Sequence, residues 1–74
     1  MTDTEKRLIE AIRTLQTKGV SLEEFAQSCG TYRQNISAFM LGNRHARIAW
    51  LEAACKMYGF SPEWILTGKG KTTT

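Results

Sequence analysis

The chain has 74 residues, of which 42% are hydrophobic, and its ten Lys or Arg against seven Asp or Glu leave a formal net charge of +3. A chain of this length forms one domain with a small core, because it buries only about 60% of its unfolded surface. It has no run of about 20 apolar residues and no basic-then-apolar signal pattern, so we expect a cytoplasmic domain without a membrane span.

The first predicted helix covers residues from about 4 to 18. Leu8, Ile12 and Leu15 recur at helical spacing, and Gly19 supplies the stop signal. We expect this helix to be part of the core scaffold.

Residues 22–41, LEEFAQSCGTYRQNISAFML, predict two short helices joined by a tight turn. Ser21 and Glu24 form a capping-box pattern at the start of the first helix. Gly30 ends this helix, where the chain has to turn with a positive φ.

A second capping-box pattern, Thr31 with Gln34, begins the next helix, although Tyr32 is an alternative first cap. Ile36 and Phe39 mark the buried side of this helix.

The opposite side of the same helix, at roughly 100° per residue, carries Arg33, Gln34, Ser37, Ala38 and Leu41. Arg and Gln pair with base edges, and the short Ser and Ala side chains let a helix enter the major groove. The alternative is an ordinary solvated helix face.

The charges are unevenly distributed along the chain. Residues 1–28 hold four basic and five acidic residues, residues 29–47 hold three arginines and no acid, and residues 48–74 hold three lysines and two acids. The stretch without acids coincides with the second short helix and the loop after it. A polyanion would be attracted to this part of the chain.

Two segments carry a family resemblance. SLEEFAQSCGTYRQNIS resembles the T-Q-E-E-L-A-x-x-x-G-V-S-x-x-x-I-S core of the lambdoid phage repressor and Cro family (XRE family), and YGFSPEWILTGKG resembles its closing L-G-V-S-x-x-W-L-L-T-G segment. The resemblance implies an all-α, compact five-helix lambda-repressor-like domain over residues 1–68, with a helix-turn-helix at 22–41. Leu22 departs from the family, which usually has a phosphate-contacting Gln there.

The same resemblance assigns roles to single residues. It implies that four residues of the second short helix face bases: Arg33, Gln34, Ser37 and Ala38. It also implies that Asn43 and Arg44 lie in a loop that binds phosphate. We add Tyr32 and Arg47 as backbone contacts, Tyr32 at the start of the reading helix and Arg47 from the charge pattern.

Two more helices are predicted after the basic loop. Ile48, Leu51, Cys55 and Tyr58 form an apolar stripe that predicts one helix with a core-facing side. The sequence SPE at 61–63 starts a short last helix, which Gly68 ends. We expect the polar residues 69–74 to be a flexible tail.

Trp50 and Met57 fall on the side of the fourth helix opposite this stripe. Either the last helix or the tail covers them, or they form a self-association surface. Phe60, Trp64 and Ile65 are further candidates for a dimer contact, although the family match favours core packing for Trp64.

The sequence gives almost no support for catalysis. His45 is the single histidine and lies between arginines, without an identifiable nucleophile or orienting carboxylate. Cys29 and Cys55 fall on apolar helix faces and predict reduced, packed thiols rather than a zinc site. We expect no enzyme activity, no cofactor and no metal.

These observations favour sequence-specific duplex DNA binding by a phage or prophage-type repressor that acts as a homodimer on a palindromic operator. One alternative is an antitoxin that represses a toxin-antitoxin operon. A second alternative is a protein-interaction module of the same fold without DNA binding.

Overall fold

The computed structural model describes residues 1–73 and contains five α-helices in that range: α1 (Asp3–Thr17), α2 (Leu22–Ser28), α3 (Arg33–Met40), α4 (Ile48–Tyr58) and α5 (Pro62–Thr67). The five predicted helices are therefore all present. None of these helices is long and apolar enough to cross a membrane.

Local sequence signals account for the starts of the first two helices. Thr2 and Glu5 form a capping box at the start of α1, which the sequence analysis missed. The Ser21 hydroxyl caps α2 by accepting a hydrogen bond from the backbone N–H of Glu24 at 3.1 Å, as predicted. Both caps satisfy amide donors that have no partner inside the helix.

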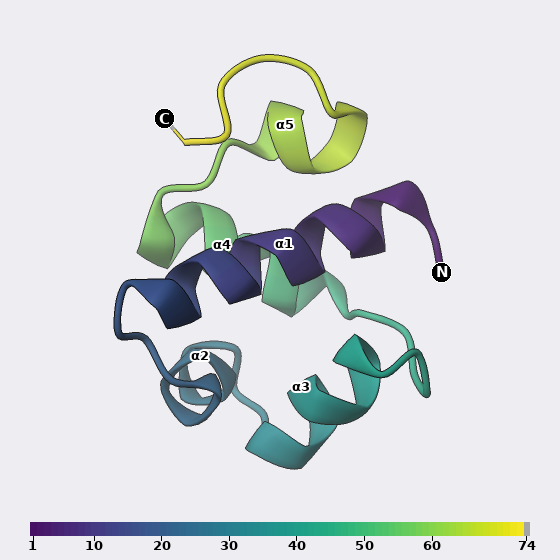
Figure 1. The fold of residues 1–74 in the computed structure, drawn as a ribbon, viewed down its shortest axis with the longest axis vertical. Helices are drawn as coiled ribbons and strands as arrows, with labels where there is room; N and C mark the ends of the chain where they lie inside the picture. The colour runs from purple at the N-terminus through teal and green to yellow at the C-terminus, as the bar shows by residue number, and fades with distance from the viewer. Residues whose placement is uncertain (74) are drawn as a thin grey trace.

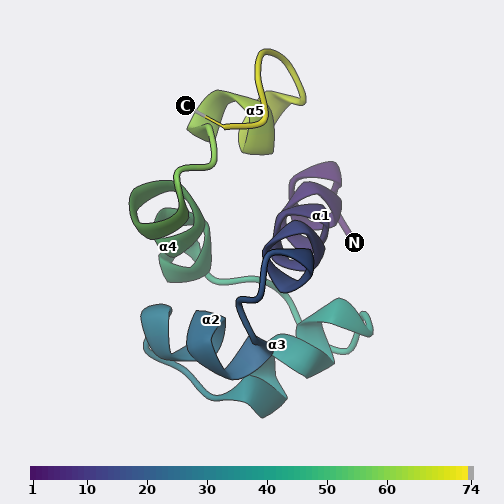
Figure 2. The same ribbon diagram turned by 60° about the vertical axis from the view of Figure 1, so that its left-hand side comes forward.

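The helices pack around α1, which crosses the middle of the molecule (Figure 1). α2 and α3 lie together at one end and α5 lies at the other, and the turned view shows the same separation (Figure 2). All five helices supply core side chains, chiefly Leu8, Ala11, Ile12, Leu15, Phe25, Ala26, Ile36, Phe39, Trp50, Ala54, Trp64 and Ile65. Phe60, in the connection between α4 and α5, is also part of this core.

The buried face of α4 differs from the predicted one. Ile48 is 74% exposed, and Leu51, Cys55 and Tyr58 are only half-buried, whereas Trp50 is 1% exposed. The Trp50 ring packs edge-on against Phe39 of α3, with centroids 5.5 Å apart. The helix carries apolar side chains on two sides, and burying the largest one removes the most apolar surface from water.

Hydrogen bonds fix the C-terminal end of α5 to α1. The Arg7 guanidinium donates hydrogen bonds to the backbone carbonyls of Ile65 at 2.7 Å and Leu66 at 3.0 Å. The chain then returns to the start of α5, where the backbone N–H of Ser61 donates to the carbonyl of Thr72 at 2.9 Å. Residues 69–73, which we expected to be a tail, thus have a backbone contact with the domain; Thr74 lies outside the described residues.

Candidate nucleic-acid interface

α2 and α3 are joined by a four-residue turn, Cys29 to Tyr32. Gly30 has φ = 73°, and the N–H of Thr31 donates to the carbonyl of Ala26 at 2.9 Å. A residue with a side chain would be strained at this φ. The prediction that Gly30 ends the helix now labelled α2 is therefore confirmed.

The start of α3 corrects the predicted capping box. Tyr32 is the N-cap residue and makes no side-chain cap, while Arg33 is the first helical residue. The Thr31 hydroxyl instead accepts a hydrogen bond from the side-chain amide of Asn35 at 2.7 Å. The hydroxyl is engaged with a side chain one turn further on, so the predicted pair of Thr31 and Gln34 does not form a box.

The outer side of α3 carries the residues predicted there. Arg33, Gln34 and Leu41 are exposed, and Ser37 and Ala38 are half-exposed. Ile36 and Phe39 lie fully buried on the other side, against the core. The result is a helix with two long polar side chains at its exposed start and two short ones in its middle.

α2 contributes two polar residues to this region that the sequence analysis missed. Glu23 and Gln27 line a surface groove together with Tyr32, Arg33 and Gln34. Their spacing of four residues puts them on one face of α2, which is a signal readable from the sequence. Glu23 brings a negative charge to the start of α3.

The loop after α3 begins with a tight helix end. Gly42 has φ = 84°, its N–H donates to the carbonyl of Phe39, and the N–H of Asn43 donates to the carbonyl of Ala38. These two bonds form a Schellman motif, which turns the chain sharply at the end of α3. Asn43, Arg44 and Arg47 are all exposed in the loop that follows.

Arg44 is held beside α3 rather than extended into solvent. Its guanidinium donates to the side-chain oxygen of Asn35, whose amide group donates in turn to Thr31. Asn35 therefore links the turn before α3 to the loop after it. The sequence analysis did not single out Asn35, because its position in the helix gave no sign of a partner nine residues away.

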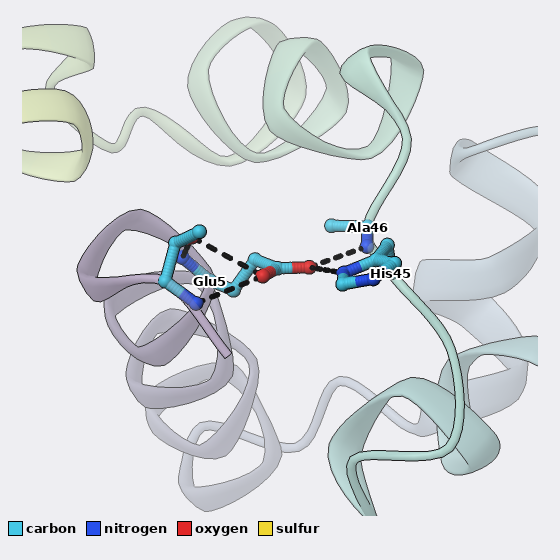
Figure 3. A network of polar contacts seen from close by, with 4 residues as sticks. Glu5, His45 and Ala46 are labelled. Carbon is cyan, nitrogen blue, oxygen red and sulfur yellow. Dashed lines mark hydrogen bonds and ion pairs between the residues drawn. The ribbon is translucent and has the colours of Figure 1, made fainter.

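The same loop is anchored to the first helix by Glu5 (Figure 3). The carboxylate accepts hydrogen bonds from the backbone N–H of Ala46 at 2.9 Å and from Nδ1 of His45 at 3.2 Å. It also accepts a hydrogen bond from the backbone N–H of Thr2 at 3.0 Å. Its side chain is only 10% exposed. The basic loop thus has an acidic partner in space that the acid-free sequence of residues 29–47 did not reveal.

These hydrogen bonds stabilise the ionised form of Glu5. The backbone N–H groups of Thr2 and Ala46, and to a smaller extent the His45 ring, lower the pKa of the carboxyl from 4.5 to about 2, against the opposing effect of burial. Glu5 is therefore a charged, structural acid at neutral pH.

Several residues predicted for a dimer contact are in the core instead. Trp50, Phe60 and Ile65 are each 1% exposed, and Trp64 is largely buried and stacks on Phe60 with centroids 6.2 Å apart. Side chains this deeply packed contribute almost no exposed surface. Of the two alternatives for Trp50, burial therefore holds, and Phe39 of α3, rather than the last helix or the tail, packs against its ring. Met57, the other candidate on α4, is 62% exposed, so neither the last helix nor the tail covers it.

In comparisons with protein-family models, curated proteins and solved structures, the chain matches none. The arrangement of its own residues therefore carries the functional argument.

The cysteines and acidic residues of the described part of the chain do not gather into a metal site. Within residues 1–73, no group of three or more His, Cys, Asp or Glu side chains is placed to hold a metal ion. Cys29 and Cys55 are free and half-buried, and burial raises the pKa of both thiols, that of Cys29 to about 11. What the region around α3 presents instead is a set of hydrogen-bond donors and positive charges on an exposed surface.

Proposed function

We propose that this domain binds duplex DNA sequence-specifically as a helix-turn-helix protein, with α2 and the turn supporting α3 and α3 reading bases in the major groove. Its role is that of a phage or prophage-type transcriptional repressor that acts as a dimer on a two-fold operator. The protein belongs, on this proposal, with the lambdoid repressors and Cro proteins that its sequence resembles.

The observation that carries the proposal is the exposed side of α3. Arg33 and Gln34 stand free at its N-terminal end, where reading helices contact base edges. Arg is suited to the two acceptors of guanine and Gln to the donor and acceptor of adenine. Ser37 and Ala38 project little from the helix, so they do not hold it away from the groove.

The loop after α3 supports the same proposal. Arg44 is bonded to Asn35 of α3, and Arg47 lies exposed at the end of the same loop, so the loop carries two permanent positive charges. The hydrogen bonds of Glu5 and Asn35 hold the loop in one position. A loop fixed in advance loses less conformational entropy when it grips phosphate. Phosphate contacts of this kind set the orientation of the helix over the bases.

Selection of bound sequences from random duplex DNA tests the proposal. We expect a two-fold sequence with half-sites about 10 base pairs apart, and binding that weakens steeply with salt. The matched control is the double substitution Arg33→Ala and Gln34→Ala, which changes only exposed side chains and should abolish enrichment while leaving the helical signal intact. Binding of the unchanged protein to no duplex, even at low salt, would exclude the proposal.

A further inference from the structure

An acid holds His45 at one of its two ring nitrogens (Figure 3). The Glu5 carboxylate lies 3.2 Å from Nδ1 of His45 and also accepts the next backbone N–H, that of Ala46, at 2.9 Å. The Glu5 side chain is 10% exposed, whereas the His45 side chain is 89% exposed. The second ring nitrogen, Nε2, is therefore open to solvent.

The partner of Nδ1 determines which nitrogen carries the proton of the neutral ring. The backbone N–H groups of Thr2 and Ala46 hold the pKa of the Glu5 carboxyl at about 2, so Glu5 is ionised wherever an imidazole titrates. An ionised carboxylate only accepts hydrogen bonds, so Nδ1 is the donor in this contact. Nε2 of the neutral ring then carries a lone pair and no proton. Neutral His45 thus turns an acceptor toward solvent.

Uptake of a second proton reverses the character of Nε2. The ring becomes positively charged, Nε2 becomes a donor, and Nδ1 keeps its bond to Glu5. A phosphate oxygen repels the lone pair of the neutral ring but accepts a charge-assisted hydrogen bond from the protonated one. His45 directly follows Arg44, in the loop that carries the two arginines proposed to contact phosphate. One proton therefore decides whether the ring helps or hinders phosphate binding there.

We propose that His45 is a phosphate contact that works only in its protonated form, so that mild acid strengthens the binding of DNA. Glu5 is its positioning residue, because it keeps the first proton on Nδ1 and leaves Nε2 to the phosphate. The inference rests on the proposed function, because the phosphate is that of duplex DNA. It adds a response to pH to the basic loop.

The charged groups around the ring can be separated from it. Met1, Glu5 and Arg44 line a hollow together with His45. Between about pH 5.5 and about pH 7.5, guanidinium groups stay charged, carboxyl groups stay chiefly ionised, and an α-amino group such as that of Met1 titrates only at the upper end. His45 is the single histidine of the chain. A comparison with a His45 variant, which shares all the other groups, therefore isolates this ring.

Fluorescence anisotropy titrations of the full chain onto a random-sequence duplex, at low and constant ionic strength, test the proposal. Affinity should rise about three- to tenfold from about pH 7.5 to about pH 5.5. Over the same interval, the slope of log affinity against log salt should steepen by up to about one unit for each bound chain, because one more phosphate is neutralised.

Two substitutions at the same position separate the charge from the titration. His45→Gln cannot take up the proton, so its affinity should change by less than about twofold over the interval. His45→Arg carries a permanent charge and should bind with the higher affinity at both ends of the interval. Circular dichroism checks that both variants keep their helical content. Equal affinity of the unchanged protein at both pH values, or the same rise in His45→Gln, overturns the inference.

The position of the proton is measured in the free protein. Because the chain has one histidine, correlation spectra of the imidazole nitrogens and carbon-bound protons contain the signals of this ring alone. At about pH 7.5 we expect the proton of the neutral ring on Nδ1. In Glu5→Gln, whose amide both donates and accepts, the proton should move toward Nε2. A ring protonated chiefly on Nε2 in the unchanged protein overturns the role of Glu5, whatever the stability of the variant.

Failure of this inference is distinguishable from failure of the proposed function. Salt-dependent binding to the duplex that does not depend on His45 would remove this contact and leave DNA binding standing. Absence of binding to the duplex at both pH values would remove the proposed function, and the phosphate contact with it.

Discussion

The carboxylate of Glu5 accepts a hydrogen bond from the backbone N–H of Ala46 at 2.9 Å, across 41 residues of sequence. The same carboxylate accepts a hydrogen bond from the backbone N–H of Thr2, at the start of α1. One side chain thus completes a helix cap and fixes the loop that follows α3. The position of the predicted phosphate-binding loop therefore depends on a residue outside the helix-turn-helix segment.

Removing this carboxylate should destabilise the domain. Glu5→Ala leaves the Ala46 amide without its acceptor and removes half of the capping box, which should lower the free energy of unfolding by about 2 kcal/mol. Urea unfolding measures the change. Glu10→Ala, at an exposed acid of the same helix, is the control and should cost less than about 0.5 kcal/mol. Equal effects of the two substitutions would contradict the role of Glu5.

Stability should also depend on pH through Glu5. Its pKa is lowered from 4.5 to about 2 in the folded state, so the unfolded chain takes up the proton first as the pH falls. The stabilisation is complete above pH 4.5 and is lost as the pH falls toward 2. Glu5→Gln lacks this titration, so its stability relative to the unchanged protein should improve across that interval. Parallel stability curves for the two proteins would show that Glu5 does not carry the effect.

Arg33 and Gln34 should determine sequence preference. Under the proposed function, replacing either residue with Ala should cost about 1 to 3 kcal/mol on the selected site and relax the preference at one base pair of each half-site. Both side chains are exposed, so the stability of the domain should not change. Competition binding against single-base variants of the site measures the preference. Equal losses on selected and random DNA would assign these residues to the backbone.

Arg44 and Arg47 should act on all duplexes alike. Arg47→Ala should make the slope of log affinity against log salt shallower by about one unit, because one phosphate contact is lost. Arg44→Ala should do the same and also free Asn35, to which the guanidinium donates. Anisotropy titrations at several salt concentrations give the slopes. A slope unchanged by either substitution would place that arginine away from the DNA.

Trp50 should behave as a core residue. Trp50→Ala removes a ring that is 1% exposed and packs on Phe39, and we expect a loss of about 3 to 5 kcal/mol or complete unfolding. Met57→Ala, on an exposed part of the same helix, should change stability by less than about 0.5 kcal/mol. Thermal unfolding followed by circular dichroism compares the two. A folded Trp50→Ala variant of normal stability would contradict the packing described here.

Local patterns were enough to predict five helices and the exposed side of α3. Ser21, Gly30 and Gly68 act through the backbone of their own or neighbouring residues, so their effects are readable from a short window. The stripe of Ile36 and Phe39 predicted the buried side of α3 because that helix has one clearly apolar side.

Two features required the tertiary structure. α4 has apolar residues on two sides, and only the packing of Trp50 against Phe39 decided that Ile48 would face solvent and leave a groove beside α5. The anchoring of the loop by Glu5 joins residues 41 positions apart, and no local pattern encodes such a contact. The sequence by itself determined where helices begin, end and carry polar side chains, because those are short-range effects. The tertiary structure decided which apolar face of α4 is buried and which acid contacts the basic loop, because both depend on how segments far apart in the sequence pack against one another.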